Sequence, residues 1–535
     1  MATNVIDNNE ARVPFFGDRV SFITGLDPLG LQNPSIQAYS LLLPGLNNVT
    51  TRIRSYSFYC WLLSEYPKQN KQLEGKEQKK FIRRAEYIIA LIASHNKIAA
   101  ISGIAYAEKV LNETKNKIDL QTGTYNEDGS TTNTYWQYSF GVFGQYYLGS
   151  LRQIGLLEEP INEKGEFIGV YKQSSKSLGI KVSGDDLATA FDKNVEIENK
   201  MLFFDCIKKG SISLQNLEQL SNDFNLKEVK KTNFENQLLL DLLFDIDEPL
   251  IQKELLLEMR KKTLLYLLSF TKLKGALNNQ YDFTSYIYQN KGVLDKKIDD
   301  CLTGWYYYQL NDYWQLACTA IFNGSLDFIL KQNGYGWMNL NSFFETCKQV
   351  IVENLIQEKF IVTDQITVTE FLKTDVFNID EVDLYKEIIK SKIERRMAFG
   401  IILILKLFIR NYENINELQL YTSKYDIGND DVLSYYTKFH KYKELTLSDF
   451  ILQFIHTRII YRHQFVAYRK MGTSNQSTHK FMIEESNIRV IGNFDPFFTS
   501  PRIRSVINYF QDLGLLNEKN QLSNDGQNLI KTLKI

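Results

Sequence analysis

Apolar side chains recur at three- and four-residue intervals through most of the chain, which is the spacing of an amphipathic α-helix. The broadest apolar faces lie between residues 195 and 450, where helices are predicted to pack on helices. Breaks are few, because the 535 residues include only 9 prolines. The pattern therefore predicts a mainly α protein. Five of its central helices are predicted at 238–244, 255–270, 305–322, 343–360 and 397–411.

The N-terminal part is predicted to form further helices. Residues 35–43 indicate a short helix that a Pro-Gly pair ends. The next helix covers 52–61, and the hydroxyl of Thr50 or Thr51 is predicted to cap it. Helical spacing resumes over 79–110.

Two segments share a pattern that is typical of a winged helix: a helix ending in Gly-Leu-Leu, a polar hairpin or turn, and a new helix started by Ser. The first lies within 135–195, where a helix is predicted from residue 135 to 151. The second begins at Ser500 and restarts its last helix at Ser523. The alternative is that each glycine merely ends a helix.

These patterns divide the chain into four predicted parts, in line with the three or four domains expected for this length. The fold class is a mainly α, multi-domain helical protein with winged-helix-like units that carry small β-hairpin wings. The parts are an N-terminal helical domain (1–118), a winged-helix-like unit (135–195), a central helical domain (196–445), and a basic helix followed by a second winged-helix-like unit (446–535).

Charge and cysteine content narrow the classes of protein. The chain has 62 basic and 63 acidic residues, so nucleic-acid binding would need a local basic patch. The five cysteines form no CxxC pair, which argues against a disulfide framework. The longest apolar run, 397–405, is too short to span a bilayer, and the N-terminus lacks a signal-peptide pattern. We therefore expect a cytoplasmic protein without a membrane partner.

Catalytic motifs are missing from the sequence. Gly25 and Gly30 have the spacing of a P-loop, but no Lys follows them. No G-x-G-x-x-G, H-E-x-x-H or G-x-S-x-G pattern occurs in a suitable context. His456 and His463 are seven residues apart, about 10.5 Å along a helix, which is poor zinc geometry. No catalytic residue, metal site or cofactor is predicted, and buried histidines are the preferred interpretation.

The strongest positive signal is a basic stretch near the C-terminus. Residues 451–504 include eight Lys and Arg residues and three Asp and Glu residues, which gives a net charge of +5. Cations on a helix neutralise phosphates, and Tyr461 and Tyr468 lie two turns apart among them. A solvated cationic face is the alternative. The predicted DNA contacts are Arg458, Arg462, Arg469 and Lys470, with Arg502 and Arg504 at the start of the predicted recognition helix.

A second arginine-rich segment lies near the N-terminus, where Arg52 and Arg54 stand beside Tyr56, Phe58, Tyr59 and Trp61. These two arginines are predicted to be buried structural cations with cation–π contacts. The surrounding residues 42–58 resemble an LxPGxxxxTxRxRYxxF motif of large, uncharacterised bacterial proteins that are encoded near phage-defence genes. Shorter segments also resemble that group: 144–149, 155–157, 184–191, 305–313 and 512–515.

The resemblance implies a component of a defence system that works beside separate ATPase or nuclease subunits, and it implies no activity of its own. Together with the basic stretch, it favours a non-enzymatic subunit that binds double-stranded DNA and acts as a scaffold. One alternative is a protein-interaction platform without DNA binding. A second is a nuclease whose site combines His456 and His463 with remote carboxylates.

Overall fold

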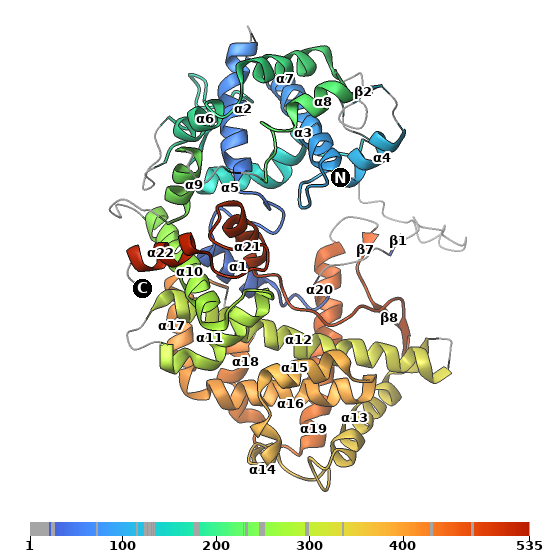
Figure 1. The fold of residues 1–535 in the computed structure, drawn as a ribbon. Helices are drawn as coiled ribbons and strands as arrows, with labels where there is room; N and C mark the ends of the chain where they lie inside the picture. The colour runs from blue at the N-terminus through green and yellow to red at the C-terminus, as the bar shows by residue number, and fades with distance from the viewer. Residues whose placement is uncertain are drawn as a thin grey trace, which may run out of the picture. The chain divides into compact units, whose positions relative to one another are not determined.

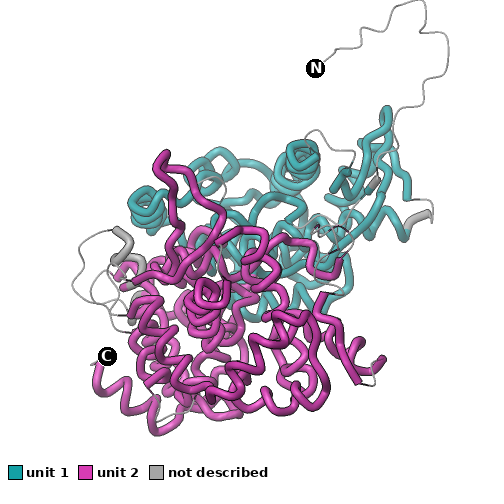
Figure 2. The backbone as a smooth tube through the Cα atoms, turned by 90° about the horizontal axis from the view of Figure 1, so that it is seen from above, with its two compact units in different colours: residues 1–35, 309–499 teal, residues 36–308, 500–535 magenta. Residues whose placement is uncertain are grey.

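The computed structural model is mainly helical, which confirms the predicted class (Figure 1). The chain folds into two compact units (Figure 2). Unit 1 comprises residues 1–35 and 309–499, and unit 2 comprises 36–308 and 500–535. The structure describes residues 21–22, 27–70, 73–113, 116–121, 126, 130, 132, 134–175, 182–227, 229, 234–244, 252–294, 299–333, 336–428, 432–471 and 476–533.

Helices α1 (Asn33–Leu42) and α12 (Asp300–Asn333) each contain a boundary between the units. The four sequence-predicted domains stay a prediction, and the first 20 residues of the N-terminal one lie outside the described residues. In the described parts of the chain, no helix combines the length and the apolar character needed to cross a bilayer. All five cysteines are buried, and none of them forms a disulfide.

Helix α2 (Arg54–Gln69) lies at the core of unit 2 and packs against α6 (Gly184–Asp192). Trp61 of α2 is fully buried among the rings of Phe191, Phe203 and Phe204. Two small antiparallel pairs complete the unit, β2 (Lys117–Asp119) with β5 (Ser211–Ser213) and β3 (Leu157–Glu158) with β4 (Lys172–Gln173). Its helices are α2 (Arg54–Gln69), α3 (Gly75–His95), α4 (Ile104–Glu113), the π-helix η1 (Phe143–Tyr147), α5 (Leu148–Gln153), α6 (Gly184–Asp192), α7 (Ile197–Lys209), α8 (Leu214–Leu220), α9 (Phe234–Phe244), α10 (Gln252–Lys274), α11 (Gln280–Leu294), α21 (Ile503–Asp512) and α22 (Asn524–Thr532).

Unit 1 surrounds the second part of α12, in which residues 309–326 are all buried. A parallel pair joins β1 (Ser21–Phe22) to β7 (Gln476–Ser477), and a three-stranded sheet has the order β6 (Trp337–Asn339), β9 (Asn487–Val490), β8 (Phe481–Glu484). The remaining helices are α13 (Leu340–Gln357), α14 (Val368–Phe371), η2 (Asp375–Asn378), α15 (Glu381–Lys390), α16 (Ile393–Asn411), η3 (Tyr412–Asn414), α17 (Ile415–Lys424), α18 (Val432–Thr437), η4 (Phe439–Tyr442), α19 (Leu447–Phe454), the π-helix η5 (Ile455–Ile460) and α20 (Tyr461–Met471).

Polar residues inside α12 hold the segment 493–499, which forms neither helix nor strand. Gln315 Nε2 donates to the carbonyl of Phe497 at 3.1 Å, and Asn323 Nδ2 donates to the carbonyl of Phe494 at 2.6 Å. Backbone groups that are removed from water need such partners. The amides therefore explain how a helix with a polar stripe can lie in the core of unit 1.

The predicted helices are largely confirmed, with four corrections. The five central helices correspond to α9, α10, α12, α13 and α16, although α13 ends at Gln357. The 79–110 region is two helices, because backbone with positive φ at Lys97 and Gly103 separates α3 from α4. The predicted threonine cap of α2 is wrong. The N-cap residue of α2 is Ile53, and the Thr50 hydroxyl accepts a hydrogen bond from the N–H of Asn47 in the preceding turn. The helix predicted from 135 begins at 141.

The two winged-helix-like segments share a local geometry within unit 2. In each, a helix ends at a left-handed glycine, Gly155 (φ 75°) or Gly514 (φ 74°). Glycine suits this conformation because it has no Cβ atom to clash with the backbone. A short antiparallel pairing follows, β3–β4 in the first and a single bridge in the second. Ser183 and Ser523 then cap the next helix. This repeat is observed, whereas its assignment as a winged helix stays a prediction.

Candidate nucleic-acid interface

The Pro44-Gly45 turn of the N-terminal motif joins several helices of unit 2. Gly45 has φ 75°, and a Cβ added there would lie 2.1 Å from Ile154 Cγ2. Its N–H donates to Gln153 Oε1 at 2.8 Å, and its carbonyl accepts from Tyr56 Oη at 2.6 Å. Only glycine suits a left-handed residue packed this closely. The motif therefore has a structural role in unit 2.

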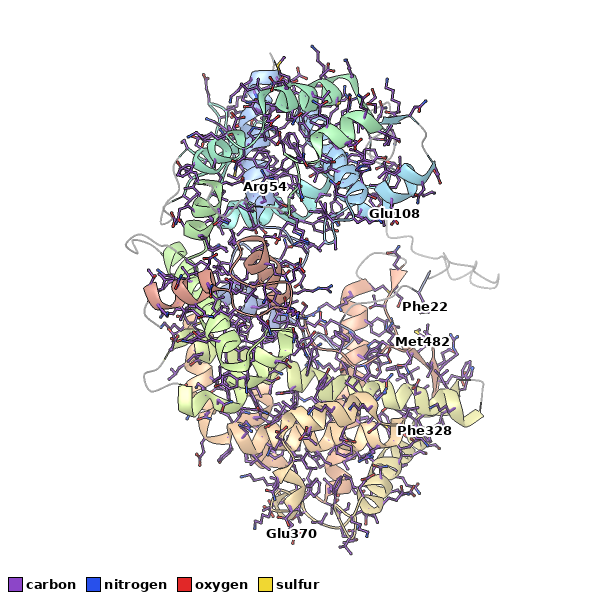
Figure 3. All side chains as sticks on the ribbon, in the orientation of Figure 1. Phe22, Arg54, Glu108, Phe328, Glu370 and Met482 are labelled. Carbon is purple, nitrogen blue, oxygen red and sulfur yellow. The ribbon has the colours of Figure 1, made fainter. Side chains whose placement is uncertain are left out.

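Arg52 and Arg54 are buried, as predicted, and each meets a carboxylate from a distant part of the chain. Arg52 Nη1 lies 2.7 Å from Asp512 Oδ1, and Arg54 Nε lies 3.3 Å from Glu235 (Figure 3 labels Arg54 on α2). The ring beneath the Arg54 guanidinium is Phe191, at 4.8 Å, rather than one of the predicted neighbours. Both arginines are about 5% exposed, so neither offers its charge to a ligand.

Glu86 is a buried carboxylate whose pKa would suit a catalytic acid. Burial raises its pKa to about 7, although Tyr59 Oη, the backbone N–H of Val142 and that of Phe143 donate to it and oppose the shift. The cavity beside Glu86 holds about 20 Å³, enough for a single water. A substrate does not fit there, so we assign Glu86 to the folding of unit 2.

The histidines considered for a nuclease have structural partners in unit 1. His463 Nδ1 lies 2.8 Å from the carbonyl of Pro28, and its Nε2 accepts from the N–H of Lys480 at 2.8 Å. Burial lowers the His463 pKa to about 4, which keeps the ring neutral. Both nitrogens are occupied. His456 packs against the ring of Phe344. Within the described residues, no group of three metal-ligating side chains occurs.

The predicted DNA contacts fall into both units. In unit 2, Arg502 is half-buried at the N-cap of α21, where its guanidinium lies 4.3 Å from the Tyr39 ring centroid. Its Nη1 also donates to the Leu43 carbonyl at 3.4 Å. Burial lowers the pKa of Arg502. Arg504, two residues further along, is exposed. The two arginines therefore have different surroundings, and their DNA contacts stay a prediction.

The other four predicted cations lie on η5 and α20 of unit 1. Arg462 Nε donates to the Leu29 carbonyl at 2.6 Å, and Lys470 Nζ donates to the Asp27 carbonyl at 2.6 Å. These bonds fasten the 27–30 turn to α20. Arg458 lies over the Tyr435 ring at 4.6 Å, and Arg469 is exposed, 5.9 Å from the ring of Phe465.

A row of exposed aromatic rings accompanies these cations on α20, and we call it the aromatic stripe: Tyr461, Phe465 and Tyr468. The spacing of four and three residues places the rings on one face of the helix. Their exposed fractions are 45%, 67% and 60%. Arg462 and Arg469, two turns apart, border the stripe, and no Asp or Glu occurs from 451 to 471. The face can therefore combine ring stacking with attraction to anions.

Sequence reasoning found the cations of this face and two of its rings, but it missed Phe465. The signal was present in the i, i+4, i+7 spacing of the rings. The same spacing also describes a buried helix face, and burial separates the two interpretations. The tethering of the 27–30 turn, more than 430 residues away in sequence, gives no local signal.

Comparison with known proteins adds no relative on which to base a function. No model of a protein family, no curated protein and no solved structure matches this chain.

Proposed function

We propose that the chain is a non-enzymatic DNA-binding and scaffolding subunit of a bacterial anti-phage defence complex. The observation that carries the DNA-binding part is the aromatic stripe of α20, exposed and bordered by arginines. The defence context rests on the resemblance of residues 42–58 alone. A scaffold suits the fold, because the buried carboxylate and histidines that could serve catalysis already have structural partners.

The stripe favours a DNA strand with unpaired bases. In a duplex the base faces are stacked on each other, so exposed protein rings can reach only the backbone and the groove edges. In a single strand each base offers a π-face, and aromatic stacking contributes about 1–3 kcal/mol per base. Arg462 and Arg469 lie beside the rings, where backbone phosphates would pass.

The test is binding of the full chain to fluorescein-labelled single-stranded and duplex DNA of equal length at two salt concentrations. We expect tighter binding of the single strand, with affinity that falls as salt rises. Equal, weak binding of both DNA forms at low salt would overturn the proposal.

A protein-interaction platform is the second candidate, since exposed Tyr and Phe rings beside Arg also occur at protein interfaces. Salt-insensitive co-purification with a neighbour-encoded subunit after nuclease treatment would favour this candidate. Loss of that partner in a Phe465→Ala variant, without any effect on DNA, would place the protein interface on the stripe.

A further inference from the structure

A polar cleft of about 420 Å³ lies in unit 2, within the range of small-molecule sites. It does not depend on the proposed function, because α20 belongs to the other unit. One wall is the outer face of α21, and the other is formed by the start of α11 and the turn before α22. The lining residues are Asn278, Asn279, Gln280, Arg504, Ile507, Asn508, Gln511 and Asn520.

Hydrogen bonds between the walls and within one of them hold this cleft in shape. Gln511 Nε2 donates to Asn520 Oδ1 at 2.8 Å, and Asn520 Nδ2 donates to Asn278 Oδ1 at 3.4 Å. The N–H of Leu277 donates to the Asn520 carbonyl at 3.0 Å. Asn520 has φ 57°, a left-handed conformation that asparagine tolerates. The amides are thus positioned before any ligand arrives.

Two side chains of the cleft are available for a ligand. Within the described residues, neither the guanidinium of Arg504 nor the amide of Asn508 has a hydrogen-bond or ion-pair partner. Both lie on the face of α21 that also carries Gln511, at intervals of four and three residues. Arg504 is the charged residue of the lining, and no carboxylate lines the cleft. The cleft therefore favours an anion.

Seven of the ten residues of α21 are buried. Its solvent-facing side chains form the wall of a concave surface. Small-molecule sites are typically concave in this way.

We propose that this cleft binds a nucleoside monophosphate. Arg504 is placed to take the phosphate, since its fork matches phosphate oxygens in a bidentate pair. The Asn508 amide presents a donor and an acceptor, the pair that reads the edge of adenine, and Gln511 adds its Oε1 as an acceptor. Ile507 supplies an apolar contact for the sugar or the base. A single lining cation matches one phosphate.

The experiment is calorimetric titration of the full chain with AMP, adenosine, inorganic phosphate and a 5′-phosphorylated oligonucleotide. We expect AMP to bind, and adenosine and phosphate each to bind at least about tenfold more weakly. Tighter binding of the oligonucleotide than of AMP would identify a strand end as the source of the nucleotide and would support the same site.

Variants assign the binding to the cleft. Arg504→Ala should lower the affinity for AMP at least about tenfold. Arg504→Lys should lower it less, because the charge stays while the forked pair of guanidinium donors is lost. Asn508→Ala removes a side chain whose amide has no hydrogen-bond partner within the described residues. It should lower the affinity for AMP but not the affinity for phosphate. Arg152→Ala, an exposed arginine of unit 2 outside the cleft, should have no effect. No AMP binding at millimolar concentration, or binding that Arg504→Ala leaves unchanged, would overturn the proposal.

Discussion

Two arginine-rich, aromatic-rich segments of this chain have opposite surroundings. Arg52 and Arg54, in unit 2, are buried against Asp512 and Glu235. The arginines of η5 and α20, in unit 1, lie at or near the surface, and the rings between them are exposed. Similar residue types thus stabilise the fold in one unit and form an open face in the other. The difference depends on whether distant residues supply carboxylates and cover the rings.

The largest expected effect concerns the buried pair. Arg54→Ala leaves Glu235 buried without its cation, which should lower the free energy of unfolding by about 3–5 kcal/mol. Urea denaturation followed by tryptophan fluorescence measures this loss. Arg152→Ala, which breaks a surface pair with Glu159, should cost no more than about 1 kcal/mol. Equal losses in the two variants would contradict the assigned structural role.

Glu86 should make the stability of the protein depend on pH. Its folded pKa of about 7 lies above the ordinary value of 4.5, so the folded state holds a proton that the unfolded state releases. Stability should therefore fall as pH rises from 4.5 to 7, by up to about 3 kcal/mol. Glu86→Gln should flatten that part of the profile in urea denaturation from pH 4.5 to 8. Parallel profiles for the two proteins would show that Glu86 does not titrate as proposed.

On the surface, loss of one ring should affect binding and spare folding. Phe465→Ala should weaken the binding of single-stranded DNA by about 1–3 kcal/mol, because one base loses its stacking partner. Fluorescence anisotropy with a labelled oligonucleotide measures the change. The matched control is Tyr412→Ala, which removes a ring of unit 1 that is 55% exposed on a different helix. A similar loss of affinity in both variants would contradict binding of DNA at the aromatic stripe.

The smallest expected effect is on salt dependence. Arg469→Ala should reduce the slope of log affinity against log salt by about 0.7, the value for one phosphate contact of a single strand. Arg395→Ala, which removes a half-buried arginine of α16 that pairs with Glu358 and Glu387, should leave the slope unchanged. An unchanged slope in the Arg469 variant would mean that this arginine contacts no phosphate.

Much of the secondary structure could be predicted from the sequence. Apolar periodicity located the central helices, and the serine caps and left-handed glycines located both repeated segments. Local signals are sufficient for such features because the interacting residues are close in sequence. The cap of α2 failed because the Thr50 hydroxyl bonds within its own turn instead.

The partners of charged residues could not be predicted in this way. Asp512 lies 460 residues from Arg52, and Glu235 lies 181 residues from Arg54. Any of the 63 Asp and Glu residues was an equal candidate. The cleft beside Arg504 is similar, since its walls come from residues 278–280 and 504–520. Positions of this kind follow from tertiary packing alone.

Photocrosslinking of the full chain to a single-stranded oligonucleotide that contains 5-bromouracil tests directly whether bases stack on the rings of α20. A base stacked on an aromatic ring crosslinks to it, and mass spectrometry of the digest identifies the peptide. Base stacking on the aromatic stripe of α20 should give crosslinks within residues 461–468. Crosslinks confined to other peptides, or their persistence at the same yield in the Phe465→Ala/Tyr468→Ala variant, would contradict it.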